Sequence, residues 1–223
     1  MKNFRHIILS LTLIYSIAFS SKIAVATKVK GQVEIVTAEK KGFADLKPGT
    51  ILSDGDKIRT GSPGFTAIIF IDDKSTLKVK DNSEVVITGK RTAASISKKI
   101  NMDEGTIRAT VNKQNTDFVI QTPTSVASVK GTDFWLVSDP ETGDQIIGIE
   151  GIVGLTNSET GQEIDVTEGM SGLSTPNGNV GLIDTDPSTI PEDPSDDIEG
   201  PSQVKIYLEG PNGEQKVMII EYQ

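Results

Sequence analysis

The chain has 223 residues, of which 31 are acidic and 22 basic, and it contains one histidine and no cysteine. A chain of this length can bury a hydrophobic core of its own, and the lack of cysteine excludes disulfides. The acidic balance disfavours nucleic acid and anionic membrane surfaces as partners, because like charges repel. With no cysteine nucleophile and His6 as the only imidazole, Ser-His and Cys-His catalysis are excluded once a signal is removed.

Residues 1–20 have the order of a secretory signal. Basic residues within 2–6 precede an apolar run at 7–19, and small residues end at Ser20. The apolar run is shorter than the roughly 20 residues that a membrane-spanning helix needs. We therefore expect cleavage after Ser20, an exported periplasmic or extracellular protein, and no membrane span in the mature chain. Residues 24–26 offer a second cleavage site, but a cut there would enter a strand pattern.

Residues 21–183 are predicted to form short β-strands. In the segment 28–35, Val29, Val33 and Ile35 fall on one face of a pleated strand, and similar alternation recurs between Asp, Asn and Gly turns up to residue 173. The segment 66–71 is apolar on both faces, which predicts a central strand. The fold class is therefore all-β: a short-strand sandwich, an irregular barrel or a solenoid of short rungs, with the solenoid-like form favoured.

The C-terminal part has a different composition. Residues 184–201 contain four prolines, seven acidic residues and no basic one, which predicts an extended, solvated linker. Residues 202–223 place two apolar segments around a Gly-Pro-Asn-Gly sequence, which is typical of a β-hairpin. A lone hairpin is marginal in water. We expect it to pack on its own domain, on a partner or on a second copy of the chain, which makes homo-association possible.

Two motifs resemble the FecR domain. The segment 118–134 carries Thr-Pro and then Lys-Gly-Thr-Asp-Phe, and 150–153 reads Glu-Gly-Ile-Val, like the family's Thr-Pro, Arg-Gly-Thr-x-Phe and Glu-Gly-x-Val elements. Upstream motifs follow in the family's order, so the resemblance covers about residues 23–173. The motif residues, to which we assign structural roles, are Gly31, Gly55, Asp56, Thr60, Gly61, Thr122, Pro123, Lys130, Gly131, Thr132, Phe134, Glu150 and Gly151. Lys130 departs from the family's arginine and replaces a forked guanidinium with a point charge.

The resemblance implies an exported, non-catalytic module. The best-known FecR-type proteins are transmembrane regulators with a cytoplasmic anti-sigma segment, one membrane helix and a periplasmic sensing region. Only six residues precede the apolar run here. We therefore expect the exported region alone, acting as a protein-binding or signalling-associated module without a cofactor. Its partner is expected to be another protein or an envelope polymer. A structural or surface-assembly protein, in which the linker and the hairpin join copies or dock the domain to a larger assembly, is the alternative, and a carboxylate-dependent hydrolase is a remote one.

Few residues suggest a specific site, and no catalytic or metal-binding residue is assigned. Asp133 and Glu150 are the carboxylate pair that an acid/base mechanism would use, although solvated strand residues explain them as well. At Gly131 and Thr132 we expect a tight corner in which the threonine hydroxyl bonds the turn. Trp135, the only tryptophan, is the candidate binding residue if its side chain is exposed.

Calcium and a basic patch are two further alternatives. Clustered aspartates at residues 54–56, 72–73 and 184–186 offer oxygen ligands, but none matches a calcium loop and ordinary turn chemistry accounts for them. Paired lysines at 28/30, 40/41 and 98/99 are interpreted as solvated surface charges.

Overall fold

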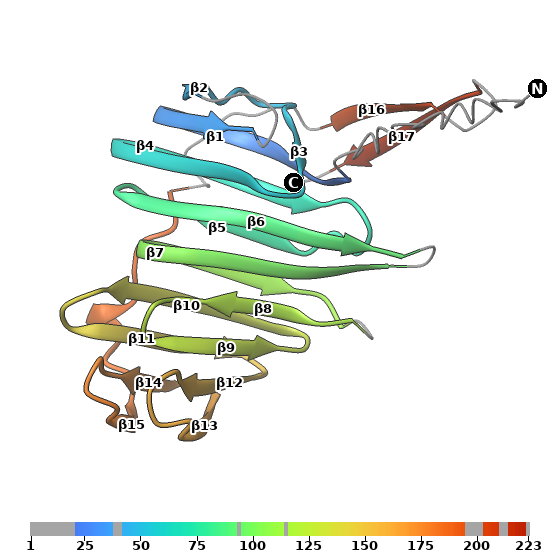
Figure 1. The fold of residues 1–223 in the computed structure, drawn as a ribbon. Coiled ribbons are helices and arrows are strands. Elements are labelled where there is room, and N and C mark those ends of the chain that lie inside the picture. Colours follow the sequence, from blue (N-terminus) through green and yellow to red (C-terminus); the bar gives the residue numbers. More distant parts are fainter. Residues whose placement is uncertain are drawn as a thin grey trace, which may run out of the picture.

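The computed structural model describes residues 21–37, 42–92, 95–113, 116–194, 203–209 and 214–221. The predicted signal, 1–20, lies outside these residues. One large antiparallel sheet with a single parallel pair, β7 with β8, forms the main domain, and a two-stranded sheet follows it (Figure 1). The all-β prediction is confirmed. In the described part of the chain, no helix combines the length and apolar character needed to cross a bilayer.

The strands are short except for β1, β4 and β7, which have 15 or 16 residues. In chain order they are β1 Lys22–Val36, β2 Ala44–Asp45, β3 Ile51–Ser53, β4 Asp56–Phe70, β5 Thr76–Val79, β6 Ser83–Arg91, β7 Ile96–Val111, β8 Phe118–Gln121, β9 Ser125–Val129, β10 Thr132–Asp139, β11 Gly143–Glu150, β12 Ile152–Asn157, β13 Glu163–Thr167, β14 Met170–Ser174, β15 Val180–Asp184, β16 Gln203–Glu209 and β17 Gln215–Glu221.

The three long strands pass through both layers of a sandwich. The first half of β4 pairs with β6 and its second half with β5, and the two halves of β7 pair with the same two strands. Beyond β7, layer A continues through β8, β9, β12 and β13, while layer B continues through β10, β11, β14 and β15. The strands are stacked like rungs from β1 to β15 (Figure 1). The fold therefore combines the sandwich and the solenoid-like form that the sequence predicted.

Glycines allow the long strands to turn from one layer to the other. Gly31 in β1 has a φ of +69°, and a Cβ atom there would lie 2.1 Å from the carbonyl oxygen of Pro63 in β4. Register shifts flank this corner in β1. Only glycine fits such a conformation and contact. Gly61, a second motif residue, lies at the same corner of β4, where a Cβ would meet the side chain of Gln32.

The core fills the space between the layers. The apolar segment of β4, residues 65–70, is buried on both faces and pairs on both sides, as the sequence predicted for a central strand. Phe70 in layer B packs edge-to-face against Phe118 in layer A, with 5.5 Å between ring centroids. Phe134, a family-motif residue, is fully buried in the same core.

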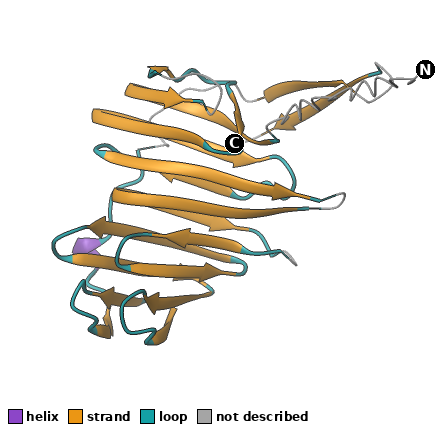
Figure 2. Ribbon diagram, in the orientation of Figure 1, coloured by secondary structure: helices purple, strands orange, loops and turns teal. Residues whose placement is uncertain are grey.

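The segment after β15 differs from the predicted solvated linker. Residues 187–189 form a 3-10 helix (Pro187–Thr189), drawn in purple in Figure 2, and Asp186 caps it. Asp193 then bonds to basic residues of layer B. The prediction considered only repulsion within the segment and missed the opposite charges on the domain that attract it. The rest of the predicted linker, residues 195–201, lies outside the described residues.

Candidate functional site

The Lys-Gly-Thr and Glu-Gly motifs form one corner of the fold. Gly131 precedes β10 and Gly151 follows β11, with positive φ angles of +72° and +82°. A Cβ on Gly151 would lie 2.7 Å from the carbonyl oxygen of Gly131 and 2.9 Å from Cγ2 of Thr132. These motifs therefore build a close backbone contact, and the structural role of Gly131 stays a prediction that substitution can test.

Thr132 does not make the predicted hydrogen bond. Its side chain is 3% exposed, and its hydroxyl has no hydrogen-bond partner among the described residues. The methyl group of this side chain instead packs at the corner against Gly151. Lys130 is exposed beside it.

The Thr-Pro motif lies apart from this corner. The Thr122 hydroxyl donates to Oδ2 of buried Asp144, and it accepts from the backbone NH of Ser125 at 2.8 Å. The Ser125 hydroxyl donates to the same carboxylate oxygen. Asp144 belongs to layer B, whereas Thr122 and Ser125 belong to layer A, so the motif joins the layers. Pro123 is exposed in the turn. Asp144 was not predictable from the sequence, because no periodicity marks a buried carboxylate.

The upstream motif residues also hold turns. Gly55 has a φ of +87°, and Asp56 accepts a hydrogen bond from the backbone NH of Ser53 at 2.8 Å. Thr60 is buried, and its hydroxyl oxygen accepts from the backbone NH of Ser83 at 3.0 Å. These contacts fix the start of β4 and its approach to β6, which is a structural role.

The aspartate clusters bond to protein groups. Asp54 accepts from the backbone NH of Gly89 at 2.9 Å, and Asp186 accepts from that of Ser188. The hydrogen bond from Ser188 lowers the pKa of Asp186. Asp72 and Asp73 both accept from the ammonium group of Lys98. Within the described residues, no group of three or more acidic, histidine or cysteine side chains has the arrangement of a metal site.

Lys98 is not the solvated surface lysine that the sequence analysis expected. Its side chain is 0% exposed and points between the layers, where its ammonium lies 2.9 Å from Asp72 and 2.8 Å from Asp73. The neighbouring Lys99 is exposed on the outer face. Alternation along β7 places one lysine on each face, and the charge on Lys98 is accommodated because the β4–β5 turn supplies two carboxylates.

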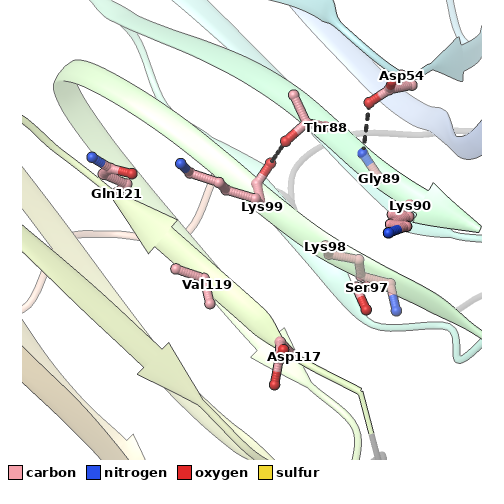
Figure 3. A pocket seen from close by; sticks show the side chains of 10 residues that line it. All are labelled: Asp54, Thr88, Gly89, Lys90, Ser97, Lys98, Lys99, Asp117, Val119 and Gln121. Atoms are coloured by element: carbon pink, nitrogen blue, oxygen red, sulfur yellow. Dashed lines mark hydrogen bonds between the residues drawn. The ribbon is translucent and has the colours of Figure 1, made fainter.

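A groove of about 590 Å³ crosses the outer face of layer A (Figure 3). It runs over β6, β7 and β8 and presents the ammonium groups of Lys90 and Lys99, the carboxylate of Asp117 and the aliphatic side chain of Val119. The Thr88 hydroxyl donates to the carbonyl of Lys99 at 2.8 Å. The complete lining consists of Asp54, Thr88, Gly89, Lys90, Ser97, Lys98, Lys99, Asp117, Val119 and Gln121. This mixture of donors, acceptors and aliphatic surface fits an extended polar ligand.

Trp135 was the candidate binding residue on the condition that its side chain is exposed, but the structure buries it. Its side chain is 1% exposed although it points to the outer face of layer B, next to Arg108 on one strand and Ile147 on the other. The ammonium of Lys80 lies 5.8 Å from the indole centroid and the Arg108 guanidinium 5.6 Å from it. Cations at this distance are attracted to the ring face.

Asp133 and Glu150 are neighbours in the register of β10 and β11, as an acid/base pair would need. Both oxygens of Asp133, however, accept from Arg108, at 2.9 Å from Nε and 2.8 Å from Nη2. This bond raises the pKa of Arg108, with burial acting in the opposite direction. The geometry therefore gives Asp133 the role of a fixed ion-pair partner.

Comparison with known proteins supports the resemblance. Residues 56–154 match the family described as FecR protein. The match is shorter than the 23–173 inferred from motifs, although β1 and β13–β15 extend the same sheet. Among proteins of curated function there is no match.

Two solved structures, both of a candidate anti-sigma factor from Parabacteroides distasonis, are similar at 13% and 15% identity, with TM-scores of 0.49 and 0.48. Each comparison covers 58% of this chain and 60% of the other, so this chain spans about three fifths of those proteins. The family match and the motifs within it therefore place a FecR domain at residues 56–154 of this chain.

Proposed function

We propose that this chain is an exported, non-catalytic FecR-domain protein that binds another protein in the cell envelope as part of a signalling process. The observation that carries the proposal is the FecR match over residues 56–154. The predicted signal at residues 1–20 supports export. The matched segment, residues 56–154, contains strands β6–β8 and therefore most of the groove, which supplies a surface for a polar partner on a rigid scaffold.

The roles of the motif residues favour binding over catalysis. Gly131, Gly151 and Thr122 hold turns and corners, and Asp133 of the carboxylate pair is tied to Arg108. In the groove, the Thr88 hydroxyl bonds to a backbone carbonyl and not to a general base. A nucleophile needs such a base within hydrogen-bond reach.

Crosslinking of the mature protein in its native envelope tests the proposal. Wild type, Val119→Arg and Asp165→Arg are compared, and the crosslinked partner is identified by mass spectrometry. Val119 lines the groove, whereas Asp165 lies in the same row on β13, three strands and about 14 Å away at the usual strand spacing. Loss of one defined protein with Val119→Arg alone supports binding through the groove. Equal capture of one protein by all three contradicts the groove as the binding surface, and capture of no protein by any of them contradicts the proposed function.

The surface-assembly alternative has its own supporting observation. Tyr207, Val217 and Ile219 on the hairpin are 61%, 49% and 49% exposed, and the edge strand β15 exposes Leu182 and Ile183 at 44% and 50%. Exposed apolar groups on β-edges promote association. Sedimentation of the mature protein at increasing concentration tests this function, because a monomer at all concentrations argues against self-assembly.

A further inference from the structure

The segment after β15 crosses the outer face of layer B between two anchors. We call residues 185–194 the strap. At its start, the hydroxyls of Thr185 and Ser171 lie 2.9 Å apart. Near its end, Asp193 bonds to Lys78 of β5 and to Nη1 of Arg108 of β7, the latter at 2.8 Å. The strap therefore spans the strands between β14 and β7, which are β11 and β10.

Trp135 and Ile147 occupy that span. Residues in register follow one row across the face: Lys78, Arg108, Trp135, Ile147 and Ser171. Trp135 is 1% and Ile147 0% exposed, although both point away from the core between the layers. The anchors of the strap lie at the two ends of this row, so the path of the strap between them runs across the row that contains the indole.

Beneath the strap, the face is cationic. Lys78, Lys80 and Arg108 supply three positive charges, and Asp133 supplies one negative charge by its double hydrogen bond to Arg108. Nη1 of Arg108 is left for Asp193, and Lys80 donates to the carbonyl of residue 192 at 2.9 Å. The strap thus supplies a carboxylate and a backbone carbonyl, and the sheet supplies three cations and an aromatic ring. Proteins recognise acidic peptides with the same groups.

The strap is held by polar contacts. Ile190 is its one large aliphatic residue and is 38% exposed, and after the backbone hydrogen bond from Thr185 to the Gly169 carbonyl no strand pairing joins the strap to the sheet. Solvent still reaches these ion pairs, because the side chains of Asp193, Lys78 and Arg108 are 14%, 22% and 24% exposed, whereas the cation of the Lys98 pairs is 0% exposed. By contrast, the buried Trp135 with an adjacent arginine has the composition of an interface hot spot. Because a second acidic segment could make the same polar contacts on this face, the strap can be exchanged for another segment of similar charge.

We propose that the face formed by Lys78, Lys80, Arg108 and Trp135 binds an extended acidic segment of a partner protein, and that the strap occupies this site until it is displaced. The inference rests on the proposed protein-binding function and adds the chemistry of the partner. Since the strap is tethered, it competes at a high effective concentration, and a partner segment binds only to the fraction of molecules in which the strap is open.

Trp135 is the single tryptophan and therefore reports on the strap directly. Quenching of its fluorescence by acrylamide is measured in the full mature chain for wild type, Asp193→Asn and Asp165→Asn. Asp165 is an exposed carboxylate on β13, which makes it a matched control. We expect Asp193→Asn to increase quenching and Asp165→Asn to leave it unchanged. Unchanged quenching in both variants overturns the covering role of the strap.

Binding in trans is measured with a labelled peptide of residues 185–194 by fluorescence anisotropy. We expect the Asp193→Asn protein to bind it about tenfold more tightly than wild type does, because the competing strap is weakened. Adding Lys78→Gln to that protein should abolish the gain, and so should placing Asp193→Lys in the peptide. Lys78→Gln leaves the Arg108–Asp133 pair intact, and the thermal transition verifies folding.

The outcomes separate this inference from the proposed function. Equal peptide binding by the Asp193→Asn and Asp165→Asn proteins, or binding that survives Lys78→Gln, overturns the acidic-segment site. The groove variant Val119→Arg should bind the peptide like its parent. If the peptide binds as expected but crosslinking yields no envelope partner, the strap site stands and the proposed function fails.

Discussion

The carbonyl oxygen of Gly131 lies 2.7 Å from the position that a Cβ atom on Gly151 would occupy. Both residues have positive φ angles, so both need the backbone freedom of glycine. Their surroundings differ, because the nearest atom to a Cβ on Gly131 is Cγ of Lys113, which belongs to a flexible side chain. The two family motifs therefore meet at a corner that is fixed by Gly151 more than by Gly131.

Gly151→Ala should reduce the free energy of unfolding more than Gly131→Ala does. A positive φ costs an L-residue about 1–2 kcal/mol at either position, and Gly151 adds a clash with backbone. Gly161→Ala is the matched control, since Gly161 has a φ of +70° with open space around it. Urea denaturation measures the three losses. Equal losses at all three positions would show that strain alone acts at the corner.

The bulkier Gly131→Val extends the test to recognition. A β-branched side chain at positive φ costs on the order of 1–3 kcal/mol, so we expect lower stability. A variant that kept its stability and lost only its partner would make the turn a recognition site.

Lys98→Met should destabilise the protein by about 3 kcal/mol, because it leaves two carboxylates of the β4–β5 turn without their buried cation. Lys99→Met is the matched control on the next residue, which points to the outer face, and exposed substitutions usually change stability by less than about 0.5 kcal/mol. Denaturant titration of both variants measures the difference. A similar effect of the two substitutions would contradict the buried ion pairs.

The local fold was predictable because it depends on alternation and turn residues. The pattern at residues 66–71 predicted a central strand, and Gly31 and Gly131 are at positions with positive φ. The environment of Trp135 was not predictable in this way. Alternation around it shows only that one aromatic faces each side, and the cover over the outer side depends on residues 185–194, about 50 positions later in the sequence.

Charge complementarity was the signal that could have located this cover. Lys78 alternates with Leu77 and Val79, and Arg108 alternates with Ile107 and Ala109, so both basic side chains were assignable to a polar face. The acidic segment 184–201 contains no basic residue. Lys78 and Arg108 must lie side by side before one carboxylate of this segment can bond to both. That neighbourhood depends on the register of β5 with β7, which pairs residues about 30 positions apart and does not follow from local sequence.

Signal removal should leave Ser21 as the first residue of the mature protein. Ile23, Ala24, Val25 and Ala26 are all 0% exposed within β1, so cleavage after residue 26 would remove core side chains. Intact-mass measurement of the exported protein identifies the terminus. A mature chain that begins at residue 27 would contradict the predicted site.

A chelator should change the melting temperature of the mature protein by less than about 5 °C. A shift of about 5 °C would correspond to a loss of roughly 1 kcal/mol or more for a domain of this size. The carboxylates of Asp54, Asp56 and Asp186 accept hydrogen bonds from backbone NH groups, so they are stabilised without a bound cation. Calorimetry with and without EDTA measures the shift. A larger decrease that calcium restores would establish a metal site.

The hairpin supplies the last prediction, since its two faces have different surroundings. Met218 is half-buried and packs against the domain core, whereas Ile219, the next residue, is 49% exposed. In Figure 1, β16 and β17 extend from the end of the domain that contains β1 and β3. Seven residue pairs join the two strands, from Gln203–Glu221 to Glu209–Gln215. The hairpin therefore has its own ladder, and among its described side chains Met218 packs against the domain.

Met218→Ala should lower the melting temperature by about 2–4 °C, as expected for a loss near 1 kcal/mol in a domain of this length. Ile219→Ala, on the opposite face, should leave it unchanged, and deletion of residues 202–223 should reproduce the effect of Met218→Ala. Hydrogen exchange tests the same packing independently, because amides paired in the ladder and held against the domain exchange slowly. If the amides of 204–222 exchanged as fast as those of 195–200, in the isolated protein and in envelope extract alike, the segment would be a disordered tail. Equal melting temperatures for Met218→Ala and wild type would show that the hairpin does not stabilise the domain, leaving association with another molecule as the role for its apolar residues.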